Sequence, residues 1–291
     1  MTAPSNRWHL RRRRIEELAG LSPAEWADGP YSIHHHHRSG TRVFVKAMNR
    51  ALPGFGNEVA AARMLVGLSL AVPVVEVIDD PAAGCAIIFA HRDLSPLGTA
   101  PEDARAMGRA LRGLHDHGAR TLAEDPAAFG TPPVTLAEVL ARSMSRLPRT
   151  HPEAPRLTRL ATRALAEDGL AAYGGACALV HGDFGLRNVG RLPDDTLCVF
   201  DFEHARAGHP ILDFAKLWDR ELAAPPQRAA FLAGYGDGCA GLPLTDEMLW
   251  PVRLWAVIGI MLYCSRIEDA HFRAHGQSLL DRLDREVAHH A

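Results

Sequence analysis

The chain has 291 residues, 47% hydrophobic and 23% charged, the composition of a soluble globular protein with a sizeable core. A formal net charge of -2 gives no basic excess that would indicate a nucleic-acid partner. The longest apolar run, 254–264, is too short to span a bilayer, and no apolar segment follows the N-terminal arginines, so we expect neither a membrane partner nor a signal peptide. Scattered cysteines without C-x-x-C spacing favour a cytoplasmic location.

The first part of the chain is predicted to form a helix and then a hairpin. The helix begins at the arginine run 11–14, and the extended runs 31–37 and 41–48 are joined by the turn 38–40. Four consecutive histidines, 34–37, suggest a metal site, but strand alternation places two on each face, so we interpret them as ordinary strand residues.

Two further apolar runs, 72–79 and 85–90, would complete a sheet of about four or five strands. Between the hairpin and these runs, Asn57 is predicted to cap a helix that ends near Gly67.

Helical periodicity dominates the rest of the chain, and a boundary is predicted near residues 91–96. We therefore expect two domains, an N-terminal lobe at 1–92 and a mostly helical lobe at 93–291. The helical segments are 101–117, 134–147, 155–173 and the region from 212 onward.

The tightest polar cluster is HGDFGLRN at 181–188, directly after an apolar run that should be a short buried strand. If 193–196 form the turn that follows, Asn188 lies directly opposite Asp201 on the next strand, with Cβ atoms ~5 Å apart. A carboxamide and a carboxylate close to Asp183 suit a hard cation such as Mg²⁺. Each aspartate alone is more typical of a turn or strand end, but the full set favours a metal site.

A metallophosphatase is the competing interpretation of this cluster, because H-G-D also occurs in those enzymes. Their further ligand motifs, G-N-H-D and G-D-x-x-D-R-G, are absent from the sequence.

The cluster resembles the catalytic loop of the aminoglycoside phosphotransferase and choline kinase family, relatives of the protein kinases. VFDFE at 199–203 is similar to the segment that corresponds to D-F-G in protein kinases. GHPILDFAKL at 208–217 resembles the family's G-D-P-x-x-D-L-A, with His209 where Asp is common. The resemblance is close over 180–216 and loose elsewhere.

This resemblance implies an α+β, bilobal protein-kinase-like fold, with a small N-terminal antiparallel-sheet lobe carrying one main helix and a larger, mostly helical C-terminal lobe. It implies that Asp183 is the base or orienting carboxylate for an acceptor hydroxyl, and that Asn188 and Asp201 hold Mg²⁺. Asp213 would brace the catalytic loop.

The nucleotide side of the site is predicted from charge and periodicity. Of the 32 basic residues only Lys46 and Lys216 are lysine, which hints that these positions need a compact ammonium. Lys46 lies among apolar strand neighbours, and Glu58 shares the inward stripe of the following helix. The pair looks like the strand-lysine and helix-glutamate ion pair of the kinase fold.

The remaining nucleotide contacts are predicted from a short loop and from the segment that follows the last strand of the sheet. No G-x-G-x-x-G is present, but DGPYS at 28–32 resembles the shortened G-x-x-S phosphate loops of small-molecule kinases, so Ser32 would touch phosphate. Phe89 would line the adenine pocket, with Ala90 and Arg92 offering backbone hydrogen bonds. ATP is the expected nucleotide, and GTP is left open.

The predicted function is ATP-dependent phosphorylation of a hydroxyl on a small polar molecule, with an aminoglycoside-like antibiotic favoured as acceptor. Acids near the C-terminus are available to bind a cationic antibiotic, although such acids are usually solvated. The alternatives are a metabolite kinase for choline, an amino alcohol, a sugar or homoserine, and a non-catalytic kinase-like nucleotide-binding protein. We expect a monomer or weak homodimer. The acids are Glu268, Asp269, Asp281 and Asp284.

Overall fold

The computed structural model describes residues 4–22, 32–48, 54–81, 84–166, 175–236 and 238–289. The predicted phosphate loop at 28–31 lies outside these residues. Ser32 begins a described strand, but its side chain and those of the histidine run are likewise outside the description. The predicted contact of Ser32 with phosphate therefore stays a prediction.

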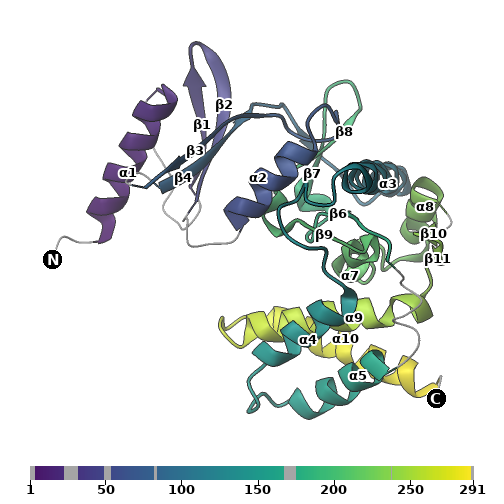
Figure 1. Ribbon diagram of the computed structural model, residues 1–291. Coiled ribbons are helices and arrows are strands. Elements are labelled where there is room, and N and C mark those ends of the chain that lie inside the picture. Colours follow the sequence, from purple (N-terminus) through teal and green to yellow (C-terminus); the bar gives the residue numbers. More distant parts are fainter. Residues whose placement is uncertain are drawn as a thin grey trace.

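A four-stranded antiparallel sheet forms the core of the N-terminal part, as the alternation predicts (Figure 1). Val43, Val45 and Ala47 on β2 face helix α1 (Pro4–Ala19), where they pack against Ile15. Lys46, on the opposite face of β2, is buried beside the second helix of this part. In spatial order the strands are β1 (Ser32–Arg38), β2 (Thr41–Met48), β4 (Gly84–Ala90) and β3 (Val74–Asp80).

Helix α2 (Gly54–Met64) covers the other face of the sheet, and Val59 packs there against Ile87. The helix begins at Gly54, four residues before the start that a cap at Asn57 predicts, so Asn57 does not cap it. Instead the Asn57 side-chain amide donates a hydrogen bond to the Glu203 carbonyl oxygen at 3.0 Å. This contact joins α2 to the catalytic segment of the second part, residues 180–217.

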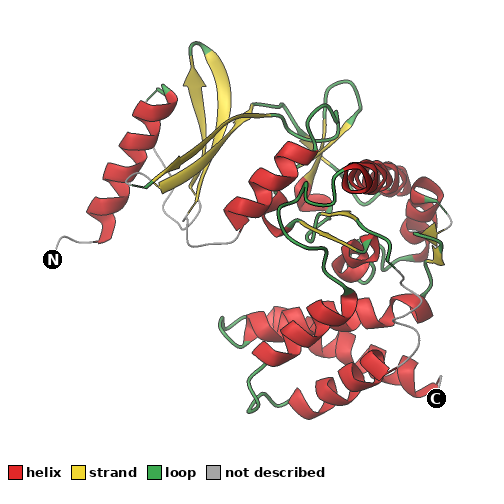
Figure 2. Cartoon of the chain, viewed as in Figure 1, coloured by secondary structure: helices red, strands yellow, loops and turns green. Residues whose placement is uncertain are grey.

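The second part is mostly helical, which confirms the expected α+β architecture (Figure 2). Helices α3 (Pro101–Glu124) and α8 (Pro225–Tyr235) pack against the main apolar core. A second apolar cluster joins four other helices. These are α4 (Leu136–Arg146), α5 (Ala154–Ala166), α9 (Asp246–Cys264) and α10 (Ala270–His289). The division into domains at residues 92 and 93 stays a prediction.

Short strands and turns between these helices carry the catalytic segment. Strand β6 pairs antiparallel with β9, and β5, β7 and β8 form a three-stranded sheet; β10 pairs with β11. The bounds are β5 (Ser95–Pro96), β6 (Ala178–Val180), β7 (Val189–Arg191), β8 (Leu197–Val199), β9 (Arg206–Gly208), β10 (Gly238–Cys239) and β11 (Leu242–Pro243). The short helices are η1 (Leu186–Asn188), η2 (Phe202–His204), η3 (Pro210–Asp213) and α7 (Phe214–Leu217).

The register of the β7–β8 hairpin differs by one residue from the prediction. Val189 pairs with Val199, and the Phe200 N–H donates to the Asn188 carbonyl, so Asn188 lies opposite Phe200 and not Asp201. The cause is the turn, because Asp195 adopts a left-handed φ of 70° and the hairpin closes around three residues instead of four.

Helix α3 extends to Glu124, beyond the predicted end at His117. Gly118 is not a C-terminal cap but a close-packing position, since a Cβ there would lie 2.4 Å from the Leu179 nitrogen. Among the described helices, α9 alone is long and apolar enough to cross a membrane by length and composition, and half of it is buried within the structure as in a core helix.

Helices α3 and α8 touch backbone to backbone, and this contact generates a stability prediction. A Cβ at Gly108 would lie 2.2 Å from the Phe231 carbonyl oxygen, so Gly108→Ala should lower the free energy of unfolding by about 2 kcal/mol in chemical denaturation. The matched control is Gly259→Ala at an exposed position of α9, where nothing lies within 4 Å and the change should be neutral or slightly stabilising. Equal effects of the two substitutions would contradict the close-contact account.

Candidate active site

The catalytic loop follows strand β6 and is held by one buried carboxylate. Asp213 accepts hydrogen bonds from the backbone N–H of His181 at 2.9 Å and of Gly182 at 2.7 Å. Gly182 has a left-handed φ of 78°, and a Cβ there would lie 2.4 Å from the His204 carbonyl oxygen. Asp213 therefore fixes the backbone at the point where only glycine fits.

Behind Asp213 lies a buried polar chain that reaches into the helical core. His115 Nε2 is 2.9 Å from the Asp213 carboxylate, and its Nδ1 is 2.8 Å from the Tyr235 hydroxyl. Burial opposes ionisation of Asp213, but the His115 contact and the loop N–H groups outweigh it and lower the pKa of this carboxyl. His115 is thus a satisfied core histidine, as its apolar stripe indicates.

His181 is fully buried and positions the next residue of the loop. Its Nε2 lies 3.0 Å from the Phe200 carbonyl oxygen, while Nδ1 accepts from the Asp183 N–H at 3.3 Å. Burial lowers the pKa of the imidazole, so the neutral ring with a proton on Nε2 fits both contacts. The ring also packs against Phe202, with centroids 4.7 Å apart.

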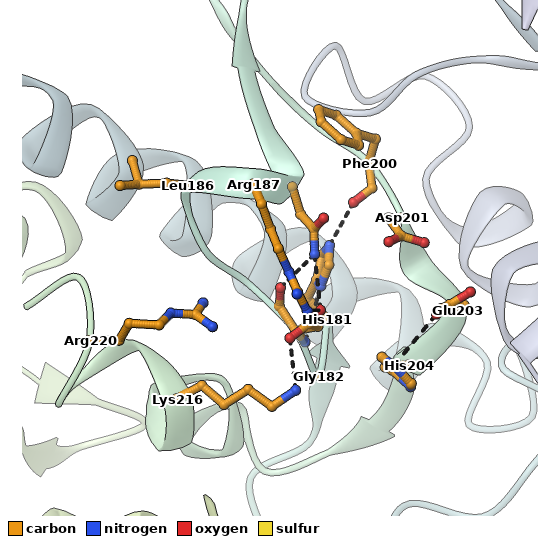
Figure 3. A network of polar contacts seen from close by, with 12 residues as sticks. His181, Gly182, Leu186, Arg187, Phe200, Asp201, Glu203, His204, Lys216 and Arg220 are labelled. Atoms are coloured by element: carbon orange, nitrogen blue, oxygen red, sulfur yellow. Dashed lines mark hydrogen bonds and ion pairs between the residues drawn. The ribbon is translucent and has the colours of Figure 1, made fainter. Parts of the chain in front are cut away.

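Asp183 carries a carboxylate that is clamped between two cations. Lys216 Nζ lies 2.7 Å from one oxygen, and Arg187 contacts the other (Figure 3). Asn188 adds hydrogen bonds from its amide to the Asp183 carbonyl at 2.8 Å and to the carboxylate at 3.2 Å. Burial would raise the pKa of Asp183, but Lys216 and Arg187 outweigh it and lower the pKa to about 2.

Lys46 lies in a second, oppositely charged cluster. Its Nζ is 2.7 Å from Glu58, 2.6 Å from Asp201 and 3.2 Å from Glu203. Burial opposes protonation of Lys46, yet the three carboxylates outweigh it and raise its pKa. The pKa of Glu58 rises to about 7, because burial and the other carboxylates outweigh Lys46. Both shifts follow from one ammonium shared by three carboxylates.

The composition of this cluster suits a cation. Ligand atoms of Glu58, Asp201 and Glu203 all lie within 4.8 Å of one another, and these three carboxyl groups outnumber the one ammonium. The donors are all oxygen, as a hard cation such as Mg²⁺ requires. Asp201 adopts a left-handed φ of 66°, a strained conformation for a non-glycine residue. Asp201, one of the two predicted ligands, therefore lies in an oxygen-rich cluster that suits Mg²⁺, and the role of Asn188 stays a prediction.

A cavity of about 830 Å³ lies against this cluster. Phe44 and Phe89 contribute an apolar wall, with ring centroids 6.3 Å apart. The Ala90 N–H donates to the Pro73 carbonyl at 2.9 Å, so the predicted backbone hydrogen bond from Ala90 to a base would use its carbonyl oxygen and stays a prediction. The predicted residues that line the cavity are Lys46, Glu58, Phe89, Ala90, Arg92, Asn188 and Asp201.

The sequence interpretation gave no site role to Arg187, Glu203 and Lys216. Each lies in a segment already quoted for its motif, and Lys216 is one of only two lysines in the chain. Low lysine usage was a signal that could have identified it. His209, where the resembled family commonly has Asp, caps η3 by accepting from the Ile211 N–H at 3.2 Å.

The comparisons agree with this arrangement. The profile of the phosphotransferase enzyme family (APH) matches residues 31–248. A search of curated proteins finds no match. The structure superposes on APH(2")-IIia, solved with GDP and kanamycin, with a TM-score of 0.70 at 14% identity, covering 95% of this chain and 99% of that one.

Two other solved structures have similar scores. Choline kinase LicA from Streptococcus pneumoniae gives a TM-score of 0.64 at 15% identity, covering 96% of this chain and 98% of that one. Macrolide 2'-phosphotransferase type I gives 0.65 at 17% identity, with the same coverage of 96% and 98%. The identities are low, so these likenesses establish the kinase-like fold. Because the family profile spans most of the sequence, the chain belongs to the phosphotransferase enzyme family and is a small-molecule kinase.

Proposed function

We propose that the protein transfers the γ-phosphoryl group of ATP to a hydroxyl of a small polar molecule. The observation that carries this proposal is the pairing of an ionised, clamped Asp183 with the carboxylate-rich cluster around Lys46. Phosphoryl transfer needs little covalent chemistry from the protein, so positioning and electrostatic stabilisation are the main contributions.

Asp183 orients the acceptor hydroxyl in this proposal. A carboxylate whose pKa is about 2 is a weak base at neutral pH, so it accepts a hydrogen bond from the hydroxyl and takes the proton late in the transfer. Both oxygens already have partners, but a carboxylate has about four lone-pair sites and retains acceptor capacity. Lys216 and Arg187 keep positive charge beside the group being transferred.

The residues that would hold Mg²⁺ are Asn188 and Asp201, with Glu203 as a further oxygen donor in the same cluster. Bound Mg²⁺ supplies positive charge that screens the β- and γ-phosphates. Lys46 donates to the phosphates from a fixed position, because its side chain is buried and Glu58 holds its ammonium.

The nucleotide is proposed to occupy the cavity beside Phe44 and Phe89. LicA has been solved with AMP and APH(2")-IIia with GDP, so both purine classes occur among structures of this fold. We favour ATP, and competition between ATP and GTP in the assay below distinguishes them.

The acceptor is the finer part of the proposal. Similar structures include antibiotic kinases and choline kinases, and an aminoglycoside-like antibiotic stays the sequence-based prediction beside a metabolite alcohol. Two of the C-terminal acids named as available for a cationic antibiotic already have partners. Asp281 and Asp284 form ion pairs with Arg156 at 2.5 and 2.7 Å. Asp269 caps the start of α10 through the Phe272 N–H.

The role of Asp183 is tested by Asp183→Ala. Turnover should fall by about 10² or more, because the orienting carboxylate is lost. The measurement is ADP release in a coupled assay over antibiotics, amino alcohols and sugars, with circular dichroism to check the fold. Asp116→Ala, on the exposed face of α3, is the matched control and should leave turnover unchanged. A folded Asp183→Ala protein with full turnover would rule out the assignment.

Metal removal gives a second test. EDTA should abolish turnover and added Mg²⁺ should restore it, while Asp201→Asn should raise the Mg²⁺ concentration for half-maximal rate by about tenfold. Asp125→Asn, in an exposed loop, is the control for a lost surface charge. Full activity in EDTA would contradict the metal assignment.

The bracing role of Asp213 gives a third test. Asp213→Asn should destabilise the protein by roughly 2–4 kcal/mol and lower kcat, because the buried His115 and two loop N–H groups lose an ionised partner. Since the pKa of Asp213 is lowered by folding, its stabilisation is present above the ordinary value near 4 and is lost as the pH falls below it. The free energies of unfolding of wild type and Asp213→Asn, measured by chemical denaturation, should therefore converge in acid.

The control for this series is Asp281→Asn on α10, which should cost less than about 1 kcal/mol because its ion pair is partly exposed. A difference between wild type and Asp213→Asn that stays constant from pH 7 to acid would contradict the buried-carboxylate account.

A further inference from the structure

The surroundings of the Asp183 carboxylate are positively charged. Lys216 and Arg187 both contact its single carboxylate, so one positive charge is left over. Their side chains are 44% and 64% exposed, so both can also contact an incoming molecule. The neighbouring Arg220 is neutralised by Glu221 at 2.7 Å.

Arg206 adds a second positive charge that has no carboxylate partner among the described residues. Its guanidinium lies 5.4 Å from the centre of the Trp255 ring, and it donates to the His204 carbonyl at 3.2 and 3.3 Å. Burial lowers the pKa of Arg206; the Asp213 carboxylate opposes this shift, and Arg142 on α4 adds to it. A partly buried cation without a direct carboxylate contact is costly, and a bound anion would reduce that cost.

The position of Arg206 relative to the catalytic loop is given by His204. Figure 3 shows His204 and Lys216 on either side of Gly182. Arg206 donates to the His204 carbonyl oxygen, and a Cβ at Gly182, the residue before Asp183, would lie 2.4 Å from the same oxygen. The Arg206 guanidinium and the Lys216 ammonium, which lies 2.7 Å from Asp183, are therefore both beside the catalytic loop.

The acids near the catalytic loop already have partners. Glu203 pairs with Lys46, and Asp213 is buried against His115. Glu221 pairs with Arg220 and also accepts from the Leu186 N–H. Within the described part of the chain, a cationic acceptor at Asp183 would therefore meet an excess of positive charge.

We propose that the acceptor is an alcohol that carries an anionic group, a carboxylate or a phosphate, bound by Arg206 and Lys216 with its hydroxyl at Asp183. This inference rests on the proposed kinase function and specifies its substrate class. In the transfer, the acceptor oxygen forms a bond to the γ-phosphorus as the bond to the ADP oxygen breaks. The hydroxyl proton passes to Asp183 and then to solvent.

The test is an ADP-release assay of the full chain with ATP and Mg²⁺ over matched acceptors. One arm compares hydroxy acids with the corresponding hydroxy amides, and a second compares sugar monophosphates with the free sugars. A third arm contains amino alcohols and kanamycin. We expect turnover with the anionic members only, and the first two arms distinguish carboxylate from phosphate.

Variants connect the result to Arg206. Arg206→Met should raise the KM of the anionic acceptor roughly 10- to 100-fold with the KM for ATP within about twofold, since a charge-assisted contact is lost. Arg206→Lys should recover part of the affinity, and Arg120→Met, exposed on α3, should change neither constant. The conservative variant also controls for a folding defect.

The outcomes separate the two proposals. Phosphorylation of neutral or cationic acceptors, with Arg206→Met indistinguishable from wild type, would overturn the anionic-acceptor inference and leave the kinase function standing. Absence of Mg²⁺-dependent ATP turnover with every acceptor, including slow hydrolysis by water, would overturn both.

Discussion

The contact on which the site depends is between the buried carboxylate of Asp213 and the backbone N–H groups of His181 and Gly182. It joins two segments about thirty residues apart and fixes the loop before any substrate binds. Asp183 follows directly, so the backbone that carries it is fixed, and Lys216, Arg187 and Asn188 hold the carboxylate itself. Preorganisation of this kind reduces the reorganisation that phosphoryl transfer would otherwise require.

Charge is divided across the catalytic cleft. Three carboxylates share one ammonium at Lys46, whereas two cations share one carboxylate at Asp183. In a partly water-excluded site such excesses are stronger than they would be in bulk solvent, because the effective dielectric constant is lower. The first excess suits a divalent cation with its nucleotide, and the second suits an anionic acceptor.

The sequence predicted the features that depend on local pattern. Alternation placed Lys46 on the correct strand face, helical spacing placed Glu58 beside it, and the HGDFGLRN motif identified Asp183 and Asn188. The sequence-based prediction was wrong where a single backbone conformation sets the strand register. The left-handed φ of Asp195 shifts the β7–β8 hairpin by one residue. The sequence also could not predict that Lys216 would reach Asp183, because that contact depends on how α7 packs against the loop. Long-range packing leaves little trace in a local pattern.

The central claim is that nucleotide and metal bind on the side of the cleft formed by Lys46, Asn188 and Asp201. The most direct measurement is a crystal structure with ADP and Mn²⁺, in which anomalous scattering locates the metal. The account predicts the metal peak at Asn188 and Asp201 with the phosphates beside Lys46. A metal peak beside Asp183 and Lys216 and away from Asp201 would contradict the account. Nucleotide bound outside the cavity lined by Phe44 and Phe89 would also contradict it.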